Sequence, residues 1–265
     1  MRGLKRVGLS DKSDLTGQTA LVTGASGGIG RAIALALAQA GADIVVHGCR
    51  NEEALKKLVA EIESLGGQVL SHRADLADLT SLQTLAAEAW QWQGKLDLLV
   101  NNAGLDVLTG DAKEWSFEQK LERLWQVDVR GCVALSRLLG PQMKDRGQGS
   151  IISIGWDQAE RGMAGDSGEL FATIKGAVMA FTRSLAQSLA PEVRVNCLAL
   201  GWIRTSWGEG SSAYWQNRAK NESLRARWGT PDDVAAAVRF LASPTADFIT
   251  GQIIEVNGGF RFGSP

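Results

Sequence analysis

The chain is poor in the residues that most often carry metal or acid–base chemistry. Its 265 residues include two histidines, three cysteines and one tyrosine. With only His47 and His72, the sequence does not favour a histidine-based metal site or triad, and the three widely spaced cysteines match no metal-ligand pattern. Cys49, Cys132 and Cys197 are therefore interpreted as buried or incidental thiols of a protein in the reducing cytoplasm.

Strong charge and long apolar runs are missing as well. The net charge is -1, which excludes a broad basic surface for nucleic acid or an anionic membrane. No apolar run is long enough to span a bilayer, and Arg2, Lys5 and Arg6 are not followed by the apolar stretch of a secretory signal. We expect neither a nucleic-acid nor a membrane partner, and we interpret residues 1–14 as a polar N-terminal extension.

Apolar, strand-like runs alternate with helix-period segments along most of the chain. The predicted strands are Thr19–Thr23, Ile44–His47, Gln68–His72, Leu96–Asn101, Ser150–Ile154, Val193–Leu198 and Ile253–Val256. The predicted helices are Ile29–Ala40, Glu52–Leu65, Leu79–Trp92, Phe117–Met143, Leu170–Leu189 and Asp232–Ala242. Continuous apolar strands separated by helices indicate a parallel sheet covered on both faces. The sequence therefore predicts one doubly wound, Rossmann-type α/β domain over residues 15–265, with seven strands.

A glycine-rich turn joins the first predicted strand to the first predicted helix. Thr19–Thr23 runs directly into Gly24-Ala25-Ser26-Gly27-Gly28-Ile29-Gly30. Glycines let the backbone turn sharply and approach a phosphate, and the N-terminus of the following helix presents free N–H donors. A tight turn without a ligand is the alternative, but the position at the first strand of a βαβ series favours a pyrophosphate site.

The spacing Thr-Gly-x-x-x-Gly-x-Gly resembles that of the short-chain dehydrogenase/reductase family. Asn101–Gly104 matches the NNAG element of that family, and Asp75-Leu76 resembles its adenine-contacting pair. Arg227–Val234 and Thr250–Gly259 are similar to its C-terminal signature. The resemblance extends from Leu15 to Phe260, is nearest to 3-oxoacyl-carrier-protein reductases, and implies a nicotinamide dinucleotide cofactor. The positions that it implies for cofactor binding are Gly24, Ser26, Gly27, Gly28, Ile29, Gly30, Arg50, Asp75, Leu76, Asn102, Ala103, Gly104, Lys175, Gly201, Ile203 and Thr205.

The end of the second predicted strand bears on the choice of nucleotide. A carboxylate there would bond the ribose 2′-hydroxyl of NAD and repel a 2′-phosphate. This chain has His47-Gly48-Cys49-Arg50 instead, and a guanidinium can pair with a phosphate in a forked geometry. Arg50 can also be read as a solvated residue at the start of the next helix. The missing carboxylate favours NADP(H) over NAD(H).

In this family, four residues carry out the chemistry: an asparagine, a serine, a tyrosine and a lysine. The chain resembles the family at only one of these four positions. Lys175 matches the lysine, which the resemblance implies binds the nicotinamide ribose. Asp128 stands in place of the asparagine and Phe171 in place of the tyrosine. The serine position falls on Trp156 when counted from the fifth strand, and on Gln158 when counted back from Phe171.

Two hypotheses from different classes follow. The first is an oxidoreductase with an unusual proton donor, for which Asp157 is preferred among the loop carboxylates Asp157, Glu160, Asp166 and Glu169. Taken one at a time, each of these carboxylates is more often a loop residue that faces water. A weaker resemblance to pteridine reductases, which place an aspartate there and carry a similar His-x-x-Arg, supports this choice. Hydride addition to an activated C=C bond or an iminium ion would need less help from an acid.

The second hypothesis is a catalytically inactive nucleotide-binding protein that acts as a sensor or as a partner of an active paralogue. Trp156 and Phe171 would then be plain packing in the substrate site. The intact glycine turn and Lys175 favour an enzyme. Recruitment to non-redox chemistry such as dehalogenation is disfavoured, because such relatives have a spoiled nucleotide site.

An aromatic segment at about residues 202–228 is predicted to form a lid over a small-molecule substrate. Its aromatic residues are Trp202, Trp207, Tyr214, Trp215 and Trp228. They can stack on a flat or bulky apolar ligand, or form the packed stripe of a short amphipathic helix. Tyr214 is a weak candidate for a surrogate proton donor. The predicted helices Phe117–Met143 and Leu170–Leu189 are apolar on more than one face, and the family resemblance implies a homotetramer built through them.

Overall fold

Seven strands form one parallel sheet in the order β3-β2-β1-β4-β5-β6-β7. The computed structural model describes residues 14–261, apart from the side chain of Trp207, so nearly all of the expected N-terminal extension lies outside the described residues. The strands are β1 (Thr19–Val22), β2 (Asp43–Gly48), β3 (Val69–Arg73), β4 (Leu98–Asn101), β5 (Gly149–Trp156), β6 (Val193–Leu200) and β7 (Ile253–Val256). The predicted seven-stranded parallel sheet is confirmed.

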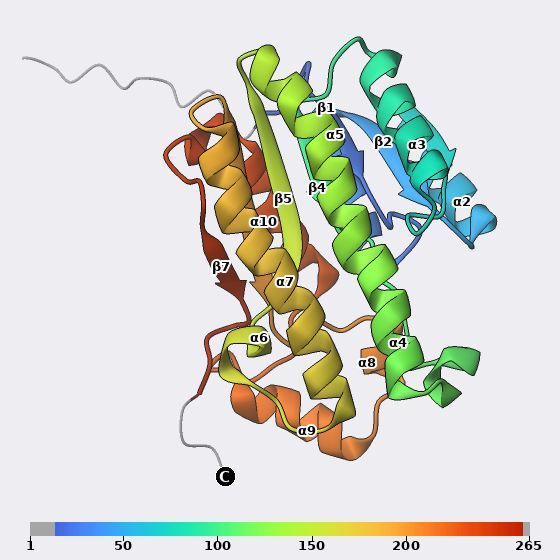
Figure 1. Cartoon of the computed structure of the whole chain (residues 1–265), viewed down its shortest axis with the longest axis vertical. Helices are drawn as coiled ribbons and strands as arrows, with labels where there is room; N and C mark the ends of the chain where they lie inside the picture. Colours follow the sequence, from blue (N-terminus) through green and yellow to red (C-terminus); the bar gives the residue numbers. More distant parts are fainter. Residues whose placement is uncertain (1–13, 262–265) are drawn as a thin grey trace, which may run out of the picture.

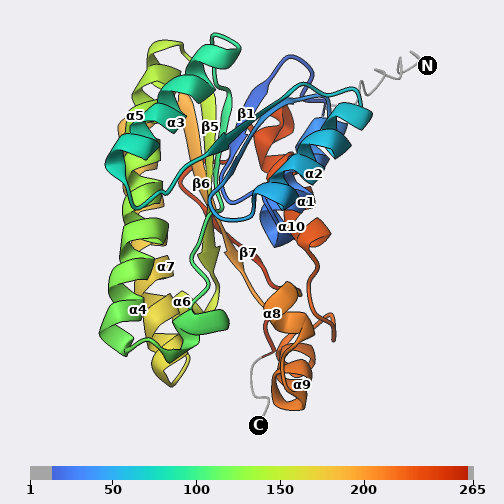
Figure 2. The ribbon, with the colours of Figure 1, turned by 90° about the vertical axis from the view of Figure 1, so that its right-hand side faces the viewer.

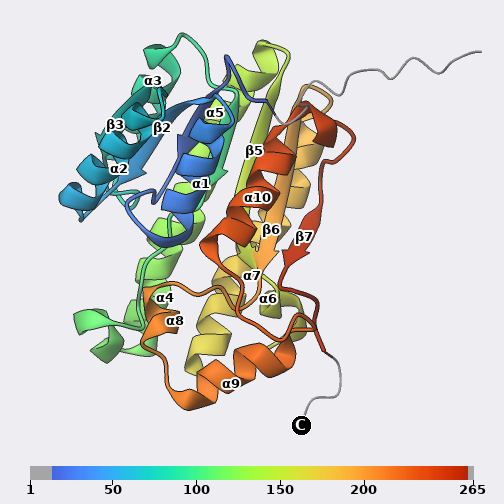
Figure 3. The ribbon, with the colours of Figure 1, turned by 180° about the vertical axis from the view of Figure 1, so that it is seen from behind.

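Helices cover both faces of this sheet (Figure 1 and Figure 2). On one face lie α1 (Gly28–Gln39), α2 (Glu52–Ser64) and α10 (Pro231–Ala242), and on the other lie α3 (Leu79–Trp92), α5 (Gly131–Asp145) and α7 (Asp166–Leu189). The helix α4 (Phe117–Leu124) continues the line of α5, and the short helices α6 (Gln158–Arg161), α8 (Ser206–Glu209) and α9 (Ala213–Glu222) lie near the carboxyl ends of the strands (Figure 3). The doubly wound architecture is therefore also confirmed.

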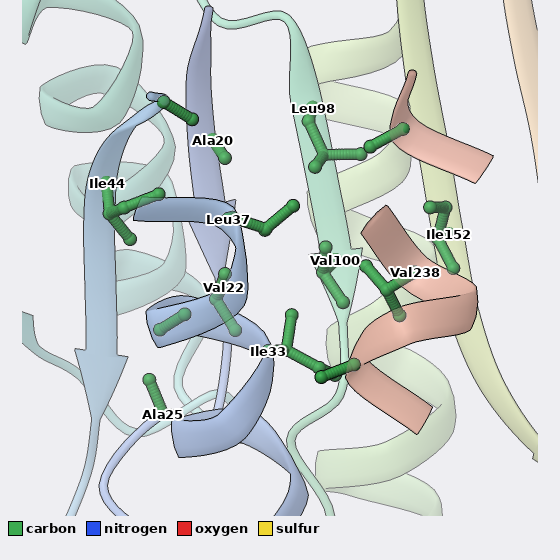
Figure 4. Packing of buried hydrophobic residues seen from close by; sticks show 14 of the residues in the cluster. Ala20, Val22, Ala25, Ile33, Leu37, Ile44, Leu98, Val100, Ile152 and Val238 are labelled. Atoms are coloured by element: carbon green, nitrogen blue, oxygen red, sulfur yellow. The ribbon is translucent and has the colours of Figure 1, made fainter. Parts of the chain in front are cut away.

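Alternation along the strands builds the two halves of the core. Ala20 and Val22 of β1 face the layer of α1 and α10, whereas Leu21 between them faces α3 and α5. Figure 4 shows Ile33 of α1 and Val238 of α10 packed against the strands in the first of these layers. Full burial of each such side chain contributes about 1.5–3 kcal/mol.

The topology also fixes where a ligand can bind. From β1 the chain moves outward to β2 and β3, and then returns to place β4 on the other side of β1. The helices that follow β1 and β4 therefore diverge and leave a crevice beyond the carboxyl ends of these two strands. The glycine-rich turn and the NNAG element both lie at this switch point.

Three features differ from the sequence prediction. The strands β5 and β6 run two residues further, to Trp156 and Leu200, because these residues pair with each other across the sheet. The single helix predicted over Phe117–Met143 is interrupted by a π-helical turn at Trp125–Arg130. Such turns shift the side chains that follow them and are frequent at functional sites. The short helices α6, α8 and α9 lack an apolar period long enough to be predicted.

Candidate active site

The glycine-rich turn is closed by backbone contacts that leave no room for side chains at two positions. Gly24 has φ +65°, and a Cβ atom there would lie 2.8 Å from Ala103 Cα. A Cβ on Gly30 would overlap the carbonyl oxygen of Gly24 and lie 2.5 Å from Asn102 Nδ2. Gly27, in contrast, would present its Cβ to open space. The glycines thus serve both the tight turn and the open groove beside it.

The NNAG element clamps this turn from β4. The Asn102 side chain donates hydrogen bonds to the carbonyl oxygens of Thr23 (2.9 Å) and Gly24 (3.2 Å). In return, the Thr23 hydroxyl accepts the backbone N–H groups of Asn102 and Ala103, both at 3.0 Å. Because each group is bonded, the two loops that border the crevice are held at a fixed separation.

His47 of β2 forms hydrogen bonds that hold the same glycine-rich turn. Its Nδ1 accepts the N–H of Gly24 at 3.3 Å, and its Nε2 lies 3.0 Å from the carbonyl oxygen of Ala74. These partners assign the proton to Nε2. Burial lowers the pKa of His47, which keeps the imidazole neutral and able to accept at Nδ1. This role could not be predicted from the sequence, because Gly24 and Ala74 lie 23 and 27 residues away from His47 along the chain.

These elements surround a groove of about 520 Å³ at the switch point. Most of the predicted cofactor-binding residues line it, namely Gly24, Ser26, Gly27, Gly28, Ile29, Gly30, Arg50, Asp75, Leu76, Asn102, Ala103, Gly104 and Thr205. Gly201 and Ile203 do not line the groove, and Lys175 lines a neighbouring cavity instead. Lining residues that the sequence analysis did not assign include His47, Cys49, Asn51, Ala74, Leu105, Asp106, Arg123, Val127 and Ser206.

The residues that are present fit a dinucleotide. The N-terminus of α1 opens onto the groove, its N-cap Gly27 provides no side-chain cap, and its first turn carries no acidic residue. Free N–H groups at a helix N-terminus attract phosphate. The guanidinium groups of Arg50 and Arg123 add positive charge along the lining, which also contains the carboxylates of Asp75 and Asp106.

A second, apolar cavity of about 380 Å³ is built mainly from aromatic side chains. Its lining comprises Leu108, Gly155, Trp156, Met163, Ser167, Phe171, Lys175, Trp202 and Trp215. The rings of Trp156 and Phe171 meet edge to face at 6.3 Å, and those of Trp202 and Trp215 are 5.4 Å apart. The four rings come from β5, α7, the segment after β6, and α9, so no single stretch of sequence indicates the cavity.

Helix α7 contributes one stripe to this cavity. Ser167, Phe171 and Lys175 are spaced four residues apart and all line it. A spacing of four puts side chains on one helix face, as the sequence predicts for Phe171 and Lys175. Ser167, one turn earlier, supplies a hydroxyl that the sequence analysis did not assign. The four-residue spacing extends from Lys175 and Phe171 back to Ser167, but nothing else in the sequence distinguishes this serine from an ordinary helix residue.

Lys175 forms a buried ion pair with Asp128. Its Nζ donates to Asp128 Oδ2 at 3.0 Å, and the Leu105 backbone N–H donates to Asp128 Oδ1 at 2.9 Å. The π-helical turn carries Asp128, whose side chain is only 2% exposed. A Cβ on Gly104 would lie 2.9 Å from Asp128 Oδ2, so glycine is needed there to admit the carboxylate. The structure thus joins two of the predicted catalytic residues.

Asp157, the preferred proton donor of the sequence analysis, does not line the cavity. Its Oδ2 accepts bonds from Arg161 at 3.3 Å and from Asn257 Nδ2 at 3.0 Å, on the side of β7. Burial raises the pKa of Asp157 to about 6. A carboxyl group with such a pKa can donate a proton near neutral pH, but Asp157 lies outside the cavity lining. The placement argues against a role in proton transfer.

The other donor candidates are also absent from the lining. Glu160 pairs with Arg183 at 2.8 Å, and Asp166 and Glu169 lie in the exposed first turn of α7. Tyr214 is 62% exposed and packs edge to face on Trp215 at 5.0 Å. Within residues 14–261, therefore, no carboxyl or phenol group lines the aromatic cavity.

The carboxylate of Glu222 holds the aromatic segment together. It accepts the indole N–H of Trp202 at 2.7 Å, the amide of Gln158 at 3.2 Å, and Nε of Arg218 at 2.6 Å. The Arg218 guanidinium lies over the rings of Trp202 (5.6 Å) and Trp215 (5.3 Å). These contacts connect α9 to Gln158 in α6 and to Trp202 in the segment that follows β6. Part of the segment forms the short helix α9, and its Trp215 lines the cavity, while the stacking of these aromatic residues on a ligand stays a prediction.

Ser153 of β5 and the three cysteines lie outside the lining of the aromatic cavity. Ser153 is buried, with its hydroxyl 3.6 Å from Cys132 Sγ. Burial raises the pKa of the Cys132 thiol, and raises that of Cys197 to about 12, so both stay protonated. Cys49 is exposed beside the groove.

Neither a metal site nor a membrane segment emerges from residues 14–261. No cluster of three or more histidine, cysteine, aspartate or glutamate side chains there can hold a metal ion. No helix in the same part of the chain combines the length and hydropathy needed to cross a bilayer.

Comparison with known proteins agrees with this geometry. The family model described as enoyl-(acyl carrier protein) reductase matches residues 24–261. Human dehydrogenase/reductase SDR family member 4 is 33% identical over 258 residues, which is 95% of this chain and 90% of the relative. The 3-oxoacyl-(acyl-carrier-protein) reductase of Synechocystis is 36% identical over 254 residues, covering 92% of this chain and 97% of the relative.

Solved structures are similar over the same range. A 7 alpha-hydroxysteroid dehydrogenase in complex with NADH and 7-oxo glycochenodeoxycholic acid superposes with a TM-score of 0.86 at 34% identity, covering 95% of this chain and 97% of that one. A short chain dehydrogenase from Burkholderia cenocepacia in complex with NADP gives a TM-score of 0.82 at 33% identity, with coverages of 92% and 98%. The chain belongs to the short-chain dehydrogenase/reductase family, and its relatives are oxidoreductases.

Proposed function

We propose that the protein is an NADP(H)-dependent oxidoreductase that acts on a small molecule without the usual phenolic proton donor. The main support is the arrangement of two adjoining sites at the carboxyl edge of one sheet. A groove with a free helix N-terminus suits a dinucleotide, and an apolar cavity beside it suits a substrate. When bound, a reduced nicotinamide supplies a hydride.

Each part of the groove has a distinct task in this proposal. The backbone N–H groups at Gly28, Ile29 and Gly30 hold the pyrophosphate, and Asp75 and Leu76 lie beside the adenine. The NNAG loop fixes the width of the groove through the bonds of Asn102. In line with the family pattern, Lys175 holds the nicotinamide ribose.

Asp128 positions Lys175 in this proposal. Its carboxylate fixes the ammonium group at 3.0 Å and is itself fixed by the N–H of Leu105. A buried cation with a bonded counter-ion keeps one orientation, which suits a group that must bind ribose hydroxyls. The side chains of Trp156 and Phe171 exclude water from the reacting end of the cavity.

The alternative is a nucleotide-binding protein that does not catalyse a reaction. It is favoured by one observation, the lack of any carboxyl or phenol group in the cavity lining within the described part of the chain. General acid catalysis typically contributes about 10²–10⁴-fold, so its loss would suppress reduction of a plain ketone while leaving the groove intact.

Arg50 is the proposed basis of a preference for NADP(H). It lines the groove directly after β2, where the chain has no carboxylate. A forked guanidinium suits the 2′-phosphate that distinguishes NADP from NAD. The known complexes of relatives contain either NADH or NADP, so the preference must be measured for this chain.

Titration of NADPH and NADH into the protein, followed by calorimetry, tests the proposal. We expect NADPH to bind at least about tenfold more tightly, a difference of 1.4 kcal/mol. Arg50→Gln should remove that preference while NADH affinity stays the same, because only the phosphate contact is lost. Arg31→Gln is the matched control, since Arg31 pairs with Glu61 outside the groove lining. Failure to bind either nucleotide would reject the function.

We further propose that the protein is a cytoplasmic homotetramer. The outer faces of α5 and α7 border a surface hollow of about 410 Å³ that contains Phe181, Leu185 and Leu189. A half-buried phenylalanine on such a face favours burial against another copy of the chain. Sedimentation velocity measures this directly, and Phe181→Glu should dissociate the assembly.

A further inference from the structure

The charge and lining of the aromatic cavity indicate which substrate it takes, if the proposed oxidoreductase function holds. Among the described residues, Lys175 is the only charged side chain in the lining. Its ammonium group is neutralised by Asp128 at 3.0 Å, where the family pattern has an uncharged asparagine. The cavity therefore has no net positive charge, although it contains a lysine.

Four aromatic rings form most of the remaining wall. Trp156, Phe171, Trp202 and Trp215 come from four separate segments and meet around a volume of about 380 Å³. The faces of such rings carry negative potential and attract organic cations, with tryptophan the most effective. Recognition of quaternary nitrogen by several aromatic rings follows this principle.

Glu222 strengthens this property at one wall. Its Oε2 accepts the indole N–H of Trp202 at 2.7 Å, which pushes electron density toward the ring. The Arg218 guanidinium already lies over Trp202 and Trp215 while not lining the cavity, so these two rings bind a cation in the folded protein.

The described part of the lining contains no acidic group, and this also favours a cationic substrate. A ketone that accepts a hydride becomes an alkoxide and must gain a proton, and none of the lining residues that the structure describes has a carboxyl or phenol group to supply one. An iminium ion, R₂C=N⁺R₂, that accepts a hydride becomes the neutral amine R₂CH–NR₂. One C–H bond forms, the C=N π pair becomes the nitrogen lone pair, and no proton is transferred.

We propose that the cavity binds a flat organic cation and that its substrates are iminium ions, which are reduced to tertiary amines by the hydride of a reduced nicotinamide dinucleotide. The replacement of tyrosine by Phe171 removes an unneeded acid and adds an aromatic wall. The replacement of asparagine by Asp128 cancels the charge that would repel the substrate. One substrate class accounts for both departures from the family pattern.

Binding of a matched pair of probes tests this without relying on turnover. The cation 2-methylisoquinolinium and the neutral 2-methylnaphthalene have nearly the same shape and differ in charge. Calorimetry in the presence of NADPH should show the cation binding at least about tenfold more tightly, which is 1.4 kcal/mol. Equal or tighter binding of the neutral probe would overturn the proposal.

Variants separate the charge from the shape of the cavity. Asp128→Asn leaves Lys175 without its counter-ion, so we expect cation affinity to fall about tenfold while affinity for the neutral probe is retained. Trp202→Leu should weaken binding of the cation more than binding of the neutral probe. Trp125→Leu changes an exposed tryptophan outside the cavity lining and is the control, which should change neither affinity. Equal losses for both probes in Asp128→Asn would show a structural role only and refute the charge argument.

A turnover comparison completes the test. The iminium 2-methyl-3,4-dihydroisoquinolinium should oxidise NADPH at least about 10²-fold faster than the ketone 1-tetralone, because only the ketone needs an acid. If NADPH binds but the ketone is reduced faster, the substrate class is wrong and the oxidoreductase function survives. If NADPH does not bind in the first place, it is the oxidoreductase function that fails.

Discussion

The dinucleotide groove and the aromatic cavity lie side by side at one edge of the sheet, but different parts of the chain determine them. Backbone atoms form much of the groove, which depends on where glycine is placed and on the bonds of Asn102 and His47. Side chains from several separate segments form most of the cavity, and its four aromatic rings come from four of them. A backbone site constrains a few residues strictly, whereas a side-chain site can change its chemistry without disturbing the fold. The comparison explains how the cofactor pattern is retained while the catalytic pattern is not.

The largest effect is expected from a single methyl group in the groove. In Gly30→Ala the new Cβ would overlap the Gly24 carbonyl oxygen and press on Asn102, so the turn must open. We expect nucleotide affinity to fall by more than about 100-fold, which is 2.8 kcal/mol. Calorimetric titration with NADPH measures the loss.

The matched control is Gly176→Ala on helix α7, where a Cβ would meet nothing within 4 Å. This change should raise the free energy of unfolding by about 0.5–1 kcal/mol, because alanine favours a helix over glycine. If Gly30→Ala bound NADPH like the wild type, the groove would not depend on backbone spacing and the comparison would fail.

The second effect tests whether the chemistry of the cavity can be changed alone. Phe171→Tyr places a phenol four residues before Lys175, on the face that lines the cavity. We expect reduction of a neutral ketone to rise by about 10²–10⁴-fold, the usual contribution of a general acid, with NADPH affinity unchanged. Steady-state kinetics with 1-tetralone measures this, and Phe171→Leu is the control that changes the ring without supplying an acid. A tyrosine variant with no gain would contradict the assignment of Phe171 to the catalytic position.

The third effect concerns Asp157, which is buried next to the site but outside both linings. Its pKa is about 6 in the folded protein and near 3.8 when unfolded, so the folded state binds more protons between these values. The free energy of unfolding should therefore decrease as the pH rises from about 4 to 6, by about 3 kcal/mol in total.

Asp157→Asn should abolish this contribution, which is measured by denaturant unfolding across that pH range. Turnover and NADPH affinity should stay within twofold of the wild type, because Asp157 bonds to Arg161 and Asn257 instead of facing the cavity. Complete loss of turnover with normal nucleotide affinity would restore Asp157 as the proton donor.

Much of the fold could be predicted from the sequence, because its signals are local. The seven apolar runs correspond to the seven strands, and glycine spacing predicted the turn at Gly24–Gly30. The π-helical turn could not be predicted, since the apolar period continues through it. What distinguishes Asp128 is a pair of bonds to Leu105 and Lys175, which lie 23 and 47 residues away.

The site could be predicted only in part for the same reason. Phe171 and Lys175 share a helix face, which spacing alone reveals. The hydrogen bonding of Asp157 involves Asn257, which lies 100 residues further along the chain, so the local sequence could not show that Asp157 lies outside the cavity lining. The role of Glu222 depends on bonds to Trp202, Gln158 and Arg218 that form only after α9 has packed.

Glu222 also has a consequence for redesign of the cavity. The same carboxylate bonds to Trp202 and to Arg218 in the helix that carries Trp215, so trimming Trp202 to admit larger molecules would also loosen α9. Trp156 and Phe171 do not depend on these bonds, because Trp156 belongs to β5 and Phe171 to α7. An engineer who wants a wider cavity with α9 in place should therefore alter Trp156 or Phe171.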